Sequence, residues 1–337
     1  MEIDHTCISP LEIVEFLWIH FQIRVFSCRK LADTSSNVYC LETNNKRLVL
    51  KEYPADTPME TISLEIDMCS YLTQKGFAVP THIQDLSGRS IIPFKGHYFT
   101  VYPWIPGNRL PFHTGSLKQS LQCAQMYGKL VYALRAFPTP LRRKDAFDRS
   151  AAAIEKSIRE HETILNAVKD DSIKEELTIK LGLLRELKNE HWEGFDNITW
   201  LNSHGDYCSN QILFEQEEVC GLLDFTSAKQ MPVIFELFRS FLYIGRGFQN
   251  GLPDMRDFSE YLRYYEKYEI LNAYDIRYAV RCYYLRILKS IFGYQQYSKN
   301  PTDFRYLHIG RDLFRQCILI HNNEAQLTAQ LCKEMYG

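Results

Sequence analysis

The chain has 337 residues, enough for two domains or for one two-lobed domain with a sizeable core. Apolar residues make up 45% and charged residues 24%, values typical of a folded globular protein and not of a disordered or membrane chain. The 39 basic and 41 acidic residues give a net charge of −2, so no positive field would draw the chain onto a phosphate backbone. We therefore do not expect nucleic acid as the primary partner.

The cysteines and the apolar segments indicate where the protein works. Ten cysteines are spread along the chain without a Cys-x-x-Cys pair, a pattern that suits free thiols in a reducing cytosol. The N-terminus lacks a basic region followed by an apolar core, and no apolar stretch reaches the roughly 18 residues that a membrane span needs. We expect a cytoplasmic protein with no membrane partner, and the sequence leaves its oligomeric state open.

The first part of the chain is predicted to be a small α+β unit. Ser9-Pro10 suits the start of a helix, because serine caps the helix and proline is tolerated in its first turn. Asn44-Asn45 lies between two strand-like runs and predicts a hairpin turn. From the period of the apolar residues we predict helices at 11–23 and 58–74 and strands at 37–43, 47–53 and 98–104.

The rest of the chain is predicted to be mostly helical. The run Ile105-Pro-Gly-Asn-Arg-Leu-Pro interrupts regular structure twice, so we place the boundary between the two parts after Trp104. One strand pair, 211–214 and 219–224, is expected within the second part. The predicted helices cover residues 116–136, 146–169, 172–192, 233–248, 255–272, 274–296 and 303–321.

Two carboxylates frame the most informative stretch, His204-Gly-Asp-Tyr-Cys-Ser-Asn-Gln, which is followed after a turn by Leu222-Leu-Asp-Phe. Asp206 lies on a loop just before a short apolar strand, and Asp224 ends the strand expected to pair with it. A tight hairpin would bring both to the same end of the sheet. Phosphoryl transfer needs such a pair, because one carboxylate orients and deprotonates a hydroxyl while another holds the metal at the nucleotide phosphates.

Here the sequence resembles the aminoglycoside phosphotransferase and choline kinase superfamily, whose loop reads His-Gly-Asp-x-x-x-x-Asn and whose metal aspartate lies in an apolar-apolar-Asp-Phe/Trp element. The resemblance implies an α+β, two-lobed, protein-kinase-like fold. Residues 1–104 would form the nucleotide-binding N-lobe with its antiparallel sheet, and residues 105–337 the helical C-lobe with the catalytic loop, metal site and acceptor site. It implies transfer of the γ-phosphate of ATP or GTP, with Mg²⁺, to a small-molecule hydroxyl.

The resemblance also assigns roles within this stretch. Asp206 corresponds to the catalytic base and Asp224 to a metal ligand. The family's metal-binding amide corresponds to position 211, which is Gln211 here, with Asn210 one residue early. Either the longer glutamine binds in register or the asparagine does so after a local shift. We favour Gln211, because the apolar Ile212-Leu-Phe follows it as the family's strand follows the asparagine.

The small lobe carries the expected nucleotide anchor. Lys51 ends the strand Leu48-Val-Leu-Lys, where the family places the lysine that contacts the α- and β-phosphates. Its expected partner is Glu65 on the following helix, with Glu60 as the second candidate because it lies nearer the helix start. An ion pair would keep the ammonium group directed at the phosphates.

Two further segments complete the expected nucleotide site. Tyr102-Pro-Trp-Ile-Pro-Gly lies where the family has the hinge that receives adenine, so backbone groups around Trp104 and Ile105 would bind the base. The phosphate-covering loop, 31–39, contains no glycine, whereas related enzymes often have one or more. Ser35 and Ser36 could still donate hydrogen bonds to phosphate.

The acceptor is less constrained by the sequence. Aminoglycosides are polycations, and enzymes that bind them should present clustered carboxylates. Basic residues slightly outnumber acidic ones over 233–337, which favours a neutral, zwitterionic or anionic acceptor such as a sugar, homoserine or another amino alcohol, although an antibiotic stays open. The helical pair at 146–192 resembles the acceptor-site insertion of such kinases. Glu236 is expected to stabilise the catalytic loop, while Arg239 could pair with it or face the substrate.

Two rival interpretations remain. A catalytically weak kinase-like protein that binds nucleotide or serves as a scaffold is favoured by the glycine-free loop and by Gln211, whereas Asp206, Asp224 and Lys51 argue against it. A protein kinase is disfavoured, because the loop reads His-Gly-Asp instead of His-Arg-Asp and no Ala-Pro-Glu element follows Asp224.

Overall fold

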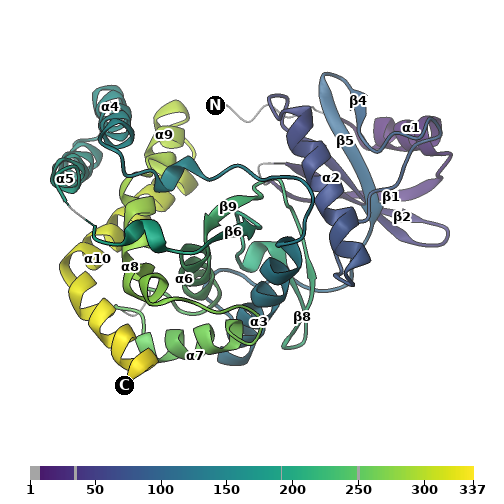
Figure 1. Ribbon diagram of the computed structural model, residues 1–337. Coiled ribbons are helices and arrows are strands. Elements are labelled where there is room, and N and C mark those ends of the chain that lie inside the picture. The colour runs from purple at the N-terminus through teal and green to yellow at the C-terminus, as the bar shows by residue number, and fades with distance from the viewer. Residues whose placement is uncertain (1–7, 34–35, 191, 249–250) are drawn as a thin grey trace. The chain divides into compact units, whose positions relative to one another are not determined.

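The computed structural model describes residues 8–33, 36–190, 192–248 and 251–337 (Figure 1). These residues form two compact units. Unit 1 contains the chain up to Leu110 together with Ala136–Pro138 and Asn210–Ala228, and unit 2 contains Pro111–Arg135, Thr139–Ser209 and Lys229–Gly337.

Unit 1 is built on a five-stranded antiparallel sheet with the strand order β1-β2-β3-β5-β4 (Figure 1). Its strands are β1 (Val25–Asp33), β2 (Asn37–Thr43), β3 (Arg47–Tyr53), β4 (Ile92–Phe94) and β5 (His97–Pro103). Two helices accompany it, α1 (Pro10–Phe21) and α2 (Met59–Gln74). The predicted bounds of β2 and β3 are confirmed, whereas the short strand β4 was missed.

The alternation of side chains along β3 divides unit 1 into a core side and a site side. Leu48 and Leu50 are fully buried in a cluster with Phe16 and Leu17 of α1. Because successive side chains of a strand point to opposite faces, Val49 and Lys51 face away from that cluster. The helix α1 is fixed by Ser9, which accepts a hydrogen bond from the backbone of Glu12 as predicted for an N-cap.

A hairpin from late in the chain also belongs to unit 1. Strands β7 (Ile212–Glu215) and β8 (Glu218–Leu222) pair antiparallel, which confirms the predicted strand pair. Phe214 exchanges two backbone hydrogen bonds with Asn108, and the Leu222 amide donates to the Ala78 carbonyl at 2.9 Å. The sequence predicted that Asp224 ends this strand. In the structure β8 ends at Leu222, two residues before Asp224.

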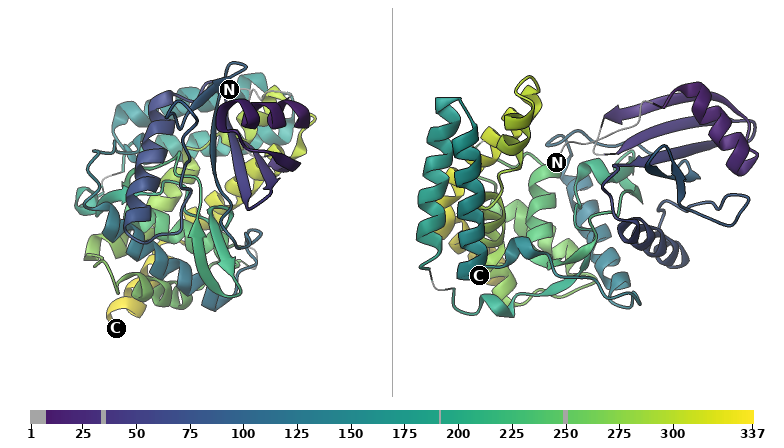
Figure 2. Two further views of the ribbon diagram at one scale, coloured as in Figure 1. Left: turned by 90° about the vertical axis from the view of Figure 1, so that its right-hand side faces the viewer. Right: turned by 90° about the horizontal axis from the view of Figure 1, so that it is seen from above.

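Unit 2 is mainly helical. Its helices are α3 (Leu117–Leu134), α4 (Ala151–Ala167), α5 (Asp171–Leu187), α6 (Val233–Ile244), α7 (Met255–Tyr265), α8 (Ala273–Leu288), α9 (Phe292–Lys299) and α10 (Phe304–Tyr336). It also contains short 3₁₀ turns at Asp145–Phe147 and Phe195–Asn197 and the strand pair β6 (Trp200–Ser203) and β9 (Lys229–Pro232). Helices α4 and α5 lie side by side (Figure 2). The expected α+β class, with a small antiparallel sheet and a mainly helical second part, is confirmed.

The main departures in unit 2 come from tertiary contacts. Residues 274–296 were predicted as one helix but form α8 and α9, and the ammonium group of the buried Lys180 donates to the carbonyls of Ile287 and Ser290 at the break. The last helix continues to Tyr336, well past the predicted end at residue 321. The β6–β9 pair was not predicted.

All cysteines in the described part of the chain are free thiols. Among the described helices, none combines the length and apolar character that crossing a bilayer requires.

Candidate functional site

The centre of unit 1 is an ion cluster around Lys51, whose side chain is 5% exposed. Its ammonium group donates to Glu65 Oε1 at 2.9 Å and Oε2 at 3.1 Å, so the expected pairing with Glu65 is confirmed. Glu60, the second candidate, is exposed near the start of α2. Lys51 also donates to Asp224 Oδ1 at 3.0 Å. The two residues are 173 positions apart in the chain, and no pattern in the sequence predicted this contact.

Glu65 couples this cluster to its surroundings. Its carboxylate accepts the Tyr53 hydroxyl at 2.7 Å and the Phe225 backbone amide at 3.1 Å, which fixes the chain next to Asp224. Burial alone would lower the pKa of Lys51, but the carboxylates of Asp224 and Glu65 outweigh it and raise that pKa well above its usual value. Lys51 is therefore held as a permanent, buried cation.

Asp224 has an unusual backbone conformation. Its φ is 59°, in the left-handed region that residues other than glycine rarely adopt. Its Oδ1 accepts hydrogen bonds from Lys51 and from the Thr226 hydroxyl at 2.7 Å, and its side chain is 28% exposed. Such conformations persist where surrounding contacts impose them, often at functional sites.

Next to this cluster lies a cavity of about 170 Å³, here called the lysine cavity. Lys51, Asp224 and both amide candidates, Asn210 and Gln211, line it, so the structure brings the predicted metal-binding groups together without choosing between the amides. Ser36, Val38, Tyr102, Arg109 and Leu223 complete its lining. Ser35, the other predicted phosphate-binding serine, lies outside the described residues.

A second cavity of unit 1, here called the hinge cavity, has a volume of about 450 Å³. It adjoins the lysine cavity, and four residues line both: Val38, Tyr102, Arg109 and Leu223. Trp104 and Ile105 line it, as the sequence had led us to expect for a base-binding hinge. Its remaining walls come from Arg29, Leu31, Val49, Gly107, Asn108 and Leu213. Sequence reasoning missed these residues, although side-chain alternation along β3 places Val49 on the same face as Lys51.

The predicted catalytic loop lies in unit 2, between β6 and the 3₁₀ turn Ser209–Gln211. The fully buried carboxylate of Glu236 holds it: Oε1 accepts the Tyr207 amide at 2.9 Å, and Oε2 accepts the Gly205 amide at 3.3 Å. The hydroxyls of Ser203 and Tyr127 also donate to Oε2. This geometry agrees with the structural role expected for Glu236.

Asp206, in the same loop, is half-buried and paired. The Arg239 guanidinium donates from Nη2 to Asp206 Oδ1 at 2.6 Å, and its plane stacks over the Tyr243 ring with 5.1 Å to the ring centroid. Burial opposes the charge of Arg239, but the nearby Asp206 carboxylate more than offsets burial and raises its pKa. The sequence offered Glu236 or the substrate as partners of Arg239; in the structure its ion-pair partner is Asp206.

Replacing Glu236 by glutamine tests the role of this carboxylate. The amide end would place an N–H₂ group against donors, so we expect the free energy of unfolding to fall by about 3 kcal/mol. Urea unfolding measures it, with Glu236→Gln compared with Glu186→Gln, which changes an exposed carboxylate on α5. Equal stability of the two variants would contradict the role of Glu236 in fixing the loop.

Unit 2 contains a cavity of about 350 Å³ beside this loop, here called the Asp206 cavity. Its lining consists of Phe112, Lys144, Gly205, Asp206, Phe235, Arg239, Tyr243, Tyr283, Arg286, Ile287, Ser290, Phe292, Ile309 and Leu313. A half-buried carboxylate, basic side chains and apolar walls are thus combined in one cavity of a size suited to a small molecule.

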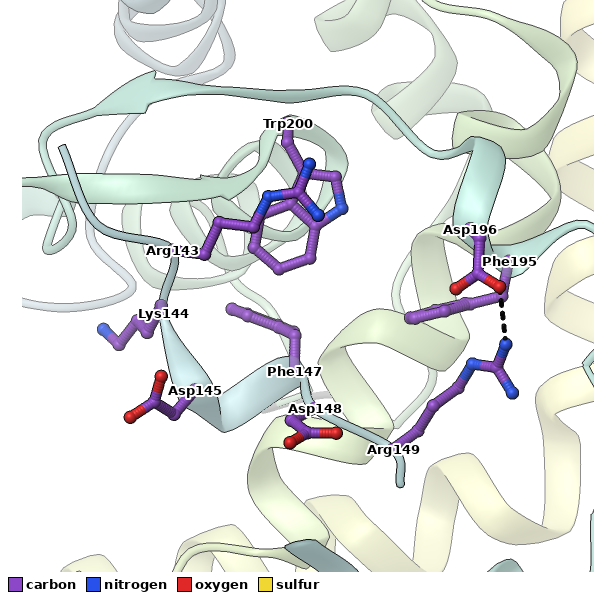
Figure 3. A pocket seen from close by; sticks show the side chains of 9 residues that line it. All are labelled: Arg143, Lys144, Asp145, Phe147, Asp148, Arg149, Phe195, Asp196 and Trp200. Carbon is purple, nitrogen blue, oxygen red and sulfur yellow. Dashed lines mark hydrogen bonds and ion pairs between the residues drawn. The ribbon is translucent and has the colours of Figure 1, made fainter. Parts of the chain in front are cut away.

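Another cavity of unit 2, about 390 Å³, is shown in Figure 3. Cations of the chain already cover two of its three aromatic rings: the Arg143 guanidinium lies 4.8 Å from the Trp200 ring centroid and that of Arg149 lies 5.5 Å from the Phe195 ring centroid. Arg149 also pairs with Asp196 at 3.0 Å, drawn as a dashed line (Figure 3). This cavity contains none of the predicted site residues.

Comparisons with known proteins identify a family and a shared fold. The model of a family described as "Phosphotransferase enzyme family" matches residues 27–274, most of the chain. No curated protein matches. Three solved structures share the fold at low identity. A spectinomycin phosphotransferase in complex with ADP and spectinomycin is 16% identical, with a TM-score of 0.65 over 98% of this chain and 100% of that one. An amicoumacin kinase is 14% identical, with a TM-score of 0.65 over 92% and 93%. A microcompartment-associated aminopropanol kinase is 13% identical, with a TM-score of 0.60 over 95% and 99%.

Proposed function

Because the chain belongs to the phosphotransferase enzyme family, we propose that it transfers the γ-phosphate of ATP or GTP to a hydroxyl group of a small molecule. In this reaction a bond forms between the acceptor oxygen and the γ-phosphorus, while the bond to the β–γ bridging oxygen breaks and a nucleoside diphosphate leaves. The observation that carries the proposal is the buried Lys51, held between Glu65 and Asp224 at the wall of the lysine cavity.

The nucleotide would occupy the two adjoining cavities of unit 1. The base would lie in the hinge cavity, between apolar side chains such as Val49 and Leu213 and against the backbone near Trp104 and Ile105. The phosphates would lie in the lysine cavity, where Lys51 and Arg109 supply positive charge and Ser36 lines the wall. Residues 1–104 would therefore share the nucleotide site with residues 105–109 and 210–224.

The donors of the lysine cavity fit Mg²⁺. Magnesium prefers oxygen ligands and is held by one or two carboxylates together with substrate phosphates and water. Asp224 offers a partly exposed carboxylate, and Gln211 an amide oxygen at the same cavity, so these two residues would hold the ion. The bound ion would neutralise charge on the nucleotide phosphates. Asn210 is the alternative amide.

Asp206 would act on the acceptor. Its carboxylate lines a cavity of unit 2 large enough for a small molecule, and it would accept the hydroxyl proton as the acceptor oxygen attacks. Arg239 would position the carboxylate through its hydrogen bond at 2.6 Å. Residues 105–337 would thus carry the acceptor site. The spectinomycin, amicoumacin and aminopropanol named for the structural relatives support a small-molecule acceptor.

A catalytically weak protein that binds nucleotide is the second candidate, favoured by Gln211 in place of the family's asparagine. Consumption of ATP and, separately, of GTP with Mg²⁺ distinguishes the two. We expect turnover that depends on one acceptor from a panel of amino alcohols, sugars, hydroxy acids and aminoglycosides. Tight nucleotide binding without turnover for any of them would favour the second candidate.

The free thiols support the expected cytoplasmic location.

The choice between the two amides makes a separate prediction. Gln211→Ala should raise the Mg²⁺ concentration needed for half-maximal transfer by about tenfold, because one oxygen ligand is lost. Asn210→Ala, at the neighbouring position of the same cavity, is the matched control and should leave the requirement close to wild type. The reverse result would show that the asparagine is the ligand.

A further inference from the structure

The Asp206 cavity has an unbalanced set of charges. Three basic side chains line it, those of Lys144, Arg239 and Arg286, but only one carboxylate does, that of Asp206. Asp206 is already paired with Arg239. Glu236 lies behind the loop and does not line the cavity, and its two oxygens accept hydrogen bonds from the loop and from Tyr127. The cavity therefore presents positive charge that its own acidic residues do not neutralise.

Two of the basic groups have no carboxylate partner. Lys144 donates to the Gly205 carbonyl at 3.3 Å, and it forms no ion pair with any described residue. The side chain of Arg286, on α8, makes neither a hydrogen bond nor an ion pair within the part of the chain that the structure describes. Lys144 and Arg286 are half-buried. Because charges withdrawn from water are ordinarily paired, two such cations in one cavity leave room for a negative group supplied from outside.

The ionisation of these groups agrees with the geometry. Burial and the neighbouring Arg286 lower the pKa of Lys144 to about 8. Burial and the nearby Arg239 likewise lower the pKa of Arg286. Burial thus disfavours the charged form of each group, and an anion between them would offset that penalty.

The other walls of the cavity are apolar. Aromatic rings of Phe112, Tyr243 and Phe292 and the aliphatic side chains of Ile309 and Leu313 face it. A ligand that fits would combine an anionic group with a body that can lie against these side chains. A polycation would meet Lys144 and Arg286 with like charge, which disfavours binding.

We propose that the acceptor is an anionic hydroxy compound, whose carboxylate or phosphate group is bound by Lys144 and Arg286 while its hydroxyl faces Asp206. This inference rests on the proposed function, because it names the class of molecule that this site phosphorylates. Lys144 also lines the cavity in Figure 3, but there the cations of Arg143, Lys144 and Arg149 are matched by the carboxylates of Asp145, Asp148 and Asp196, so that cavity has no excess of positive charge.

Four matched probes test the proposal: 4-(hydroxymethyl)benzoate, 4-(hydroxymethyl)phenyl phosphate, 4-(hydroxymethyl)benzamide and 4-(hydroxymethyl)benzylamine. They share a ring and a hydroxyl and differ in the charged group. Calorimetric titration of the full chain, in buffer free of phosphate and sulfate, measures their affinities. We expect at least one anion to bind about tenfold more tightly than the neutral amide, and the amine to bind most weakly. The benzoate and phosphate arms show which anion fits.

Variants assign the preference to the two cations. Arg286→Gln should reduce the anion preference from about tenfold to less than about threefold. Arg277→Gln removes an exposed arginine from the same helix and should leave the preference unchanged. Lys144→Gln provides an independent measurement if Arg286→Gln does not fold.

The outcomes separate this inference from the proposed function. Equal affinity for all four probes, tighter binding of the amine, or no measurable binding of either anion would overturn it, as would an anion preference that survives both substitutions. Transfer of phosphate to the amide or the amine but to neither anion would uphold the proposed function and overturn the inference. An anion preference that the variants abolish, in a protein that transfers phosphate to no acceptor, would uphold the inference about binding and count against the proposed function.

Discussion

Replacement of Asp206 by asparagine is expected to lower the kcat of phosphoryl transfer by about 10²–10⁴-fold, the range typical for loss of a general base. The asparagine can still accept the hydrogen bond from Arg239, so the loop should keep its geometry. It cannot take up the proton of the acceptor hydroxyl. The nucleotide sites proposed in unit 1 do not include Asp206, so the Kd for Mg-nucleotide should change by less than about twofold.

The Asp206 prediction is checked by single-turnover transfer rates and by nucleotide titration of the same preparations. Glu186→Gln, which neutralises an exposed carboxylate of unit 2, serves as the control and should keep the wild-type rate. If the asparagine variant transfers phosphate at the wild-type rate, Asp206 is not the base. If it loses nucleotide affinity as well, the assigned division of roles is wrong.

Replacement of Lys51 by methionine should have the largest effect on stability. The substitution leaves the carboxylates of Glu65 and Asp224 without their shared cation. Removal of one partner from a buried ion pair typically costs about 3–5 kcal/mol of the free energy of unfolding. Because the Asp224 side chain is 28% exposed, water screens part of that charge, and we expect the lower end of this range. Nucleotide affinity should fall as well, because the phosphates lose their main cation.

A double variant distinguishes the lost ion pair from lost packing. Lys51→Met combined with Glu65→Gln removes the unpaired buried charge, so it should be more stable than Lys51→Met alone in urea unfolding. Lys46→Met, an exposed lysine next to the β2–β3 turn, is the control and should unfold like wild type. A loss that the second substitution does not relieve would mean that packing, and not charge, holds Lys51 in place.

Local patterns predicted the elements that local interactions determine. Strands β2 and β3 have the predicted bounds, because the Asn44-Asn45 turn fixes the end of β2 and the start of β3. The pairing of Lys51 with Glu65 was also foreseen, since it joins a strand to the helix that follows it. The β6–β9 pair was missed because its strands have four residues each and lie far apart in sequence.

Contacts between distant parts of the chain account for the rest. Asp224 meets Lys51 across 173 positions, and Arg239 meets Asp206 from α6, and neither contact leaves a periodic signal in the sequence. The break between α8 and α9 lies where Lys180 of α5 donates to the carbonyls of Ile287 and Ser290. Helical periodicity continues through this point, so only the tertiary structure reveals the end of the helix.

The fate of the γ-phosphate tests the central claim most directly. Nucleotide labelled in that group is incubated with Mg²⁺, the full chain and each hydroxyl compound of the panel, and the label is followed by chromatography and mass spectrometry. We predict that the label appears in a phosphate monoester of one acceptor, in equal amount to the nucleoside diphosphate formed. Asp206→Asn should form this product about 10²–10⁴-fold more slowly. Label released only as inorganic phosphate, or retained entirely in bound nucleotide with every acceptor, would contradict the assignment of the chain as a small-molecule phosphotransferase.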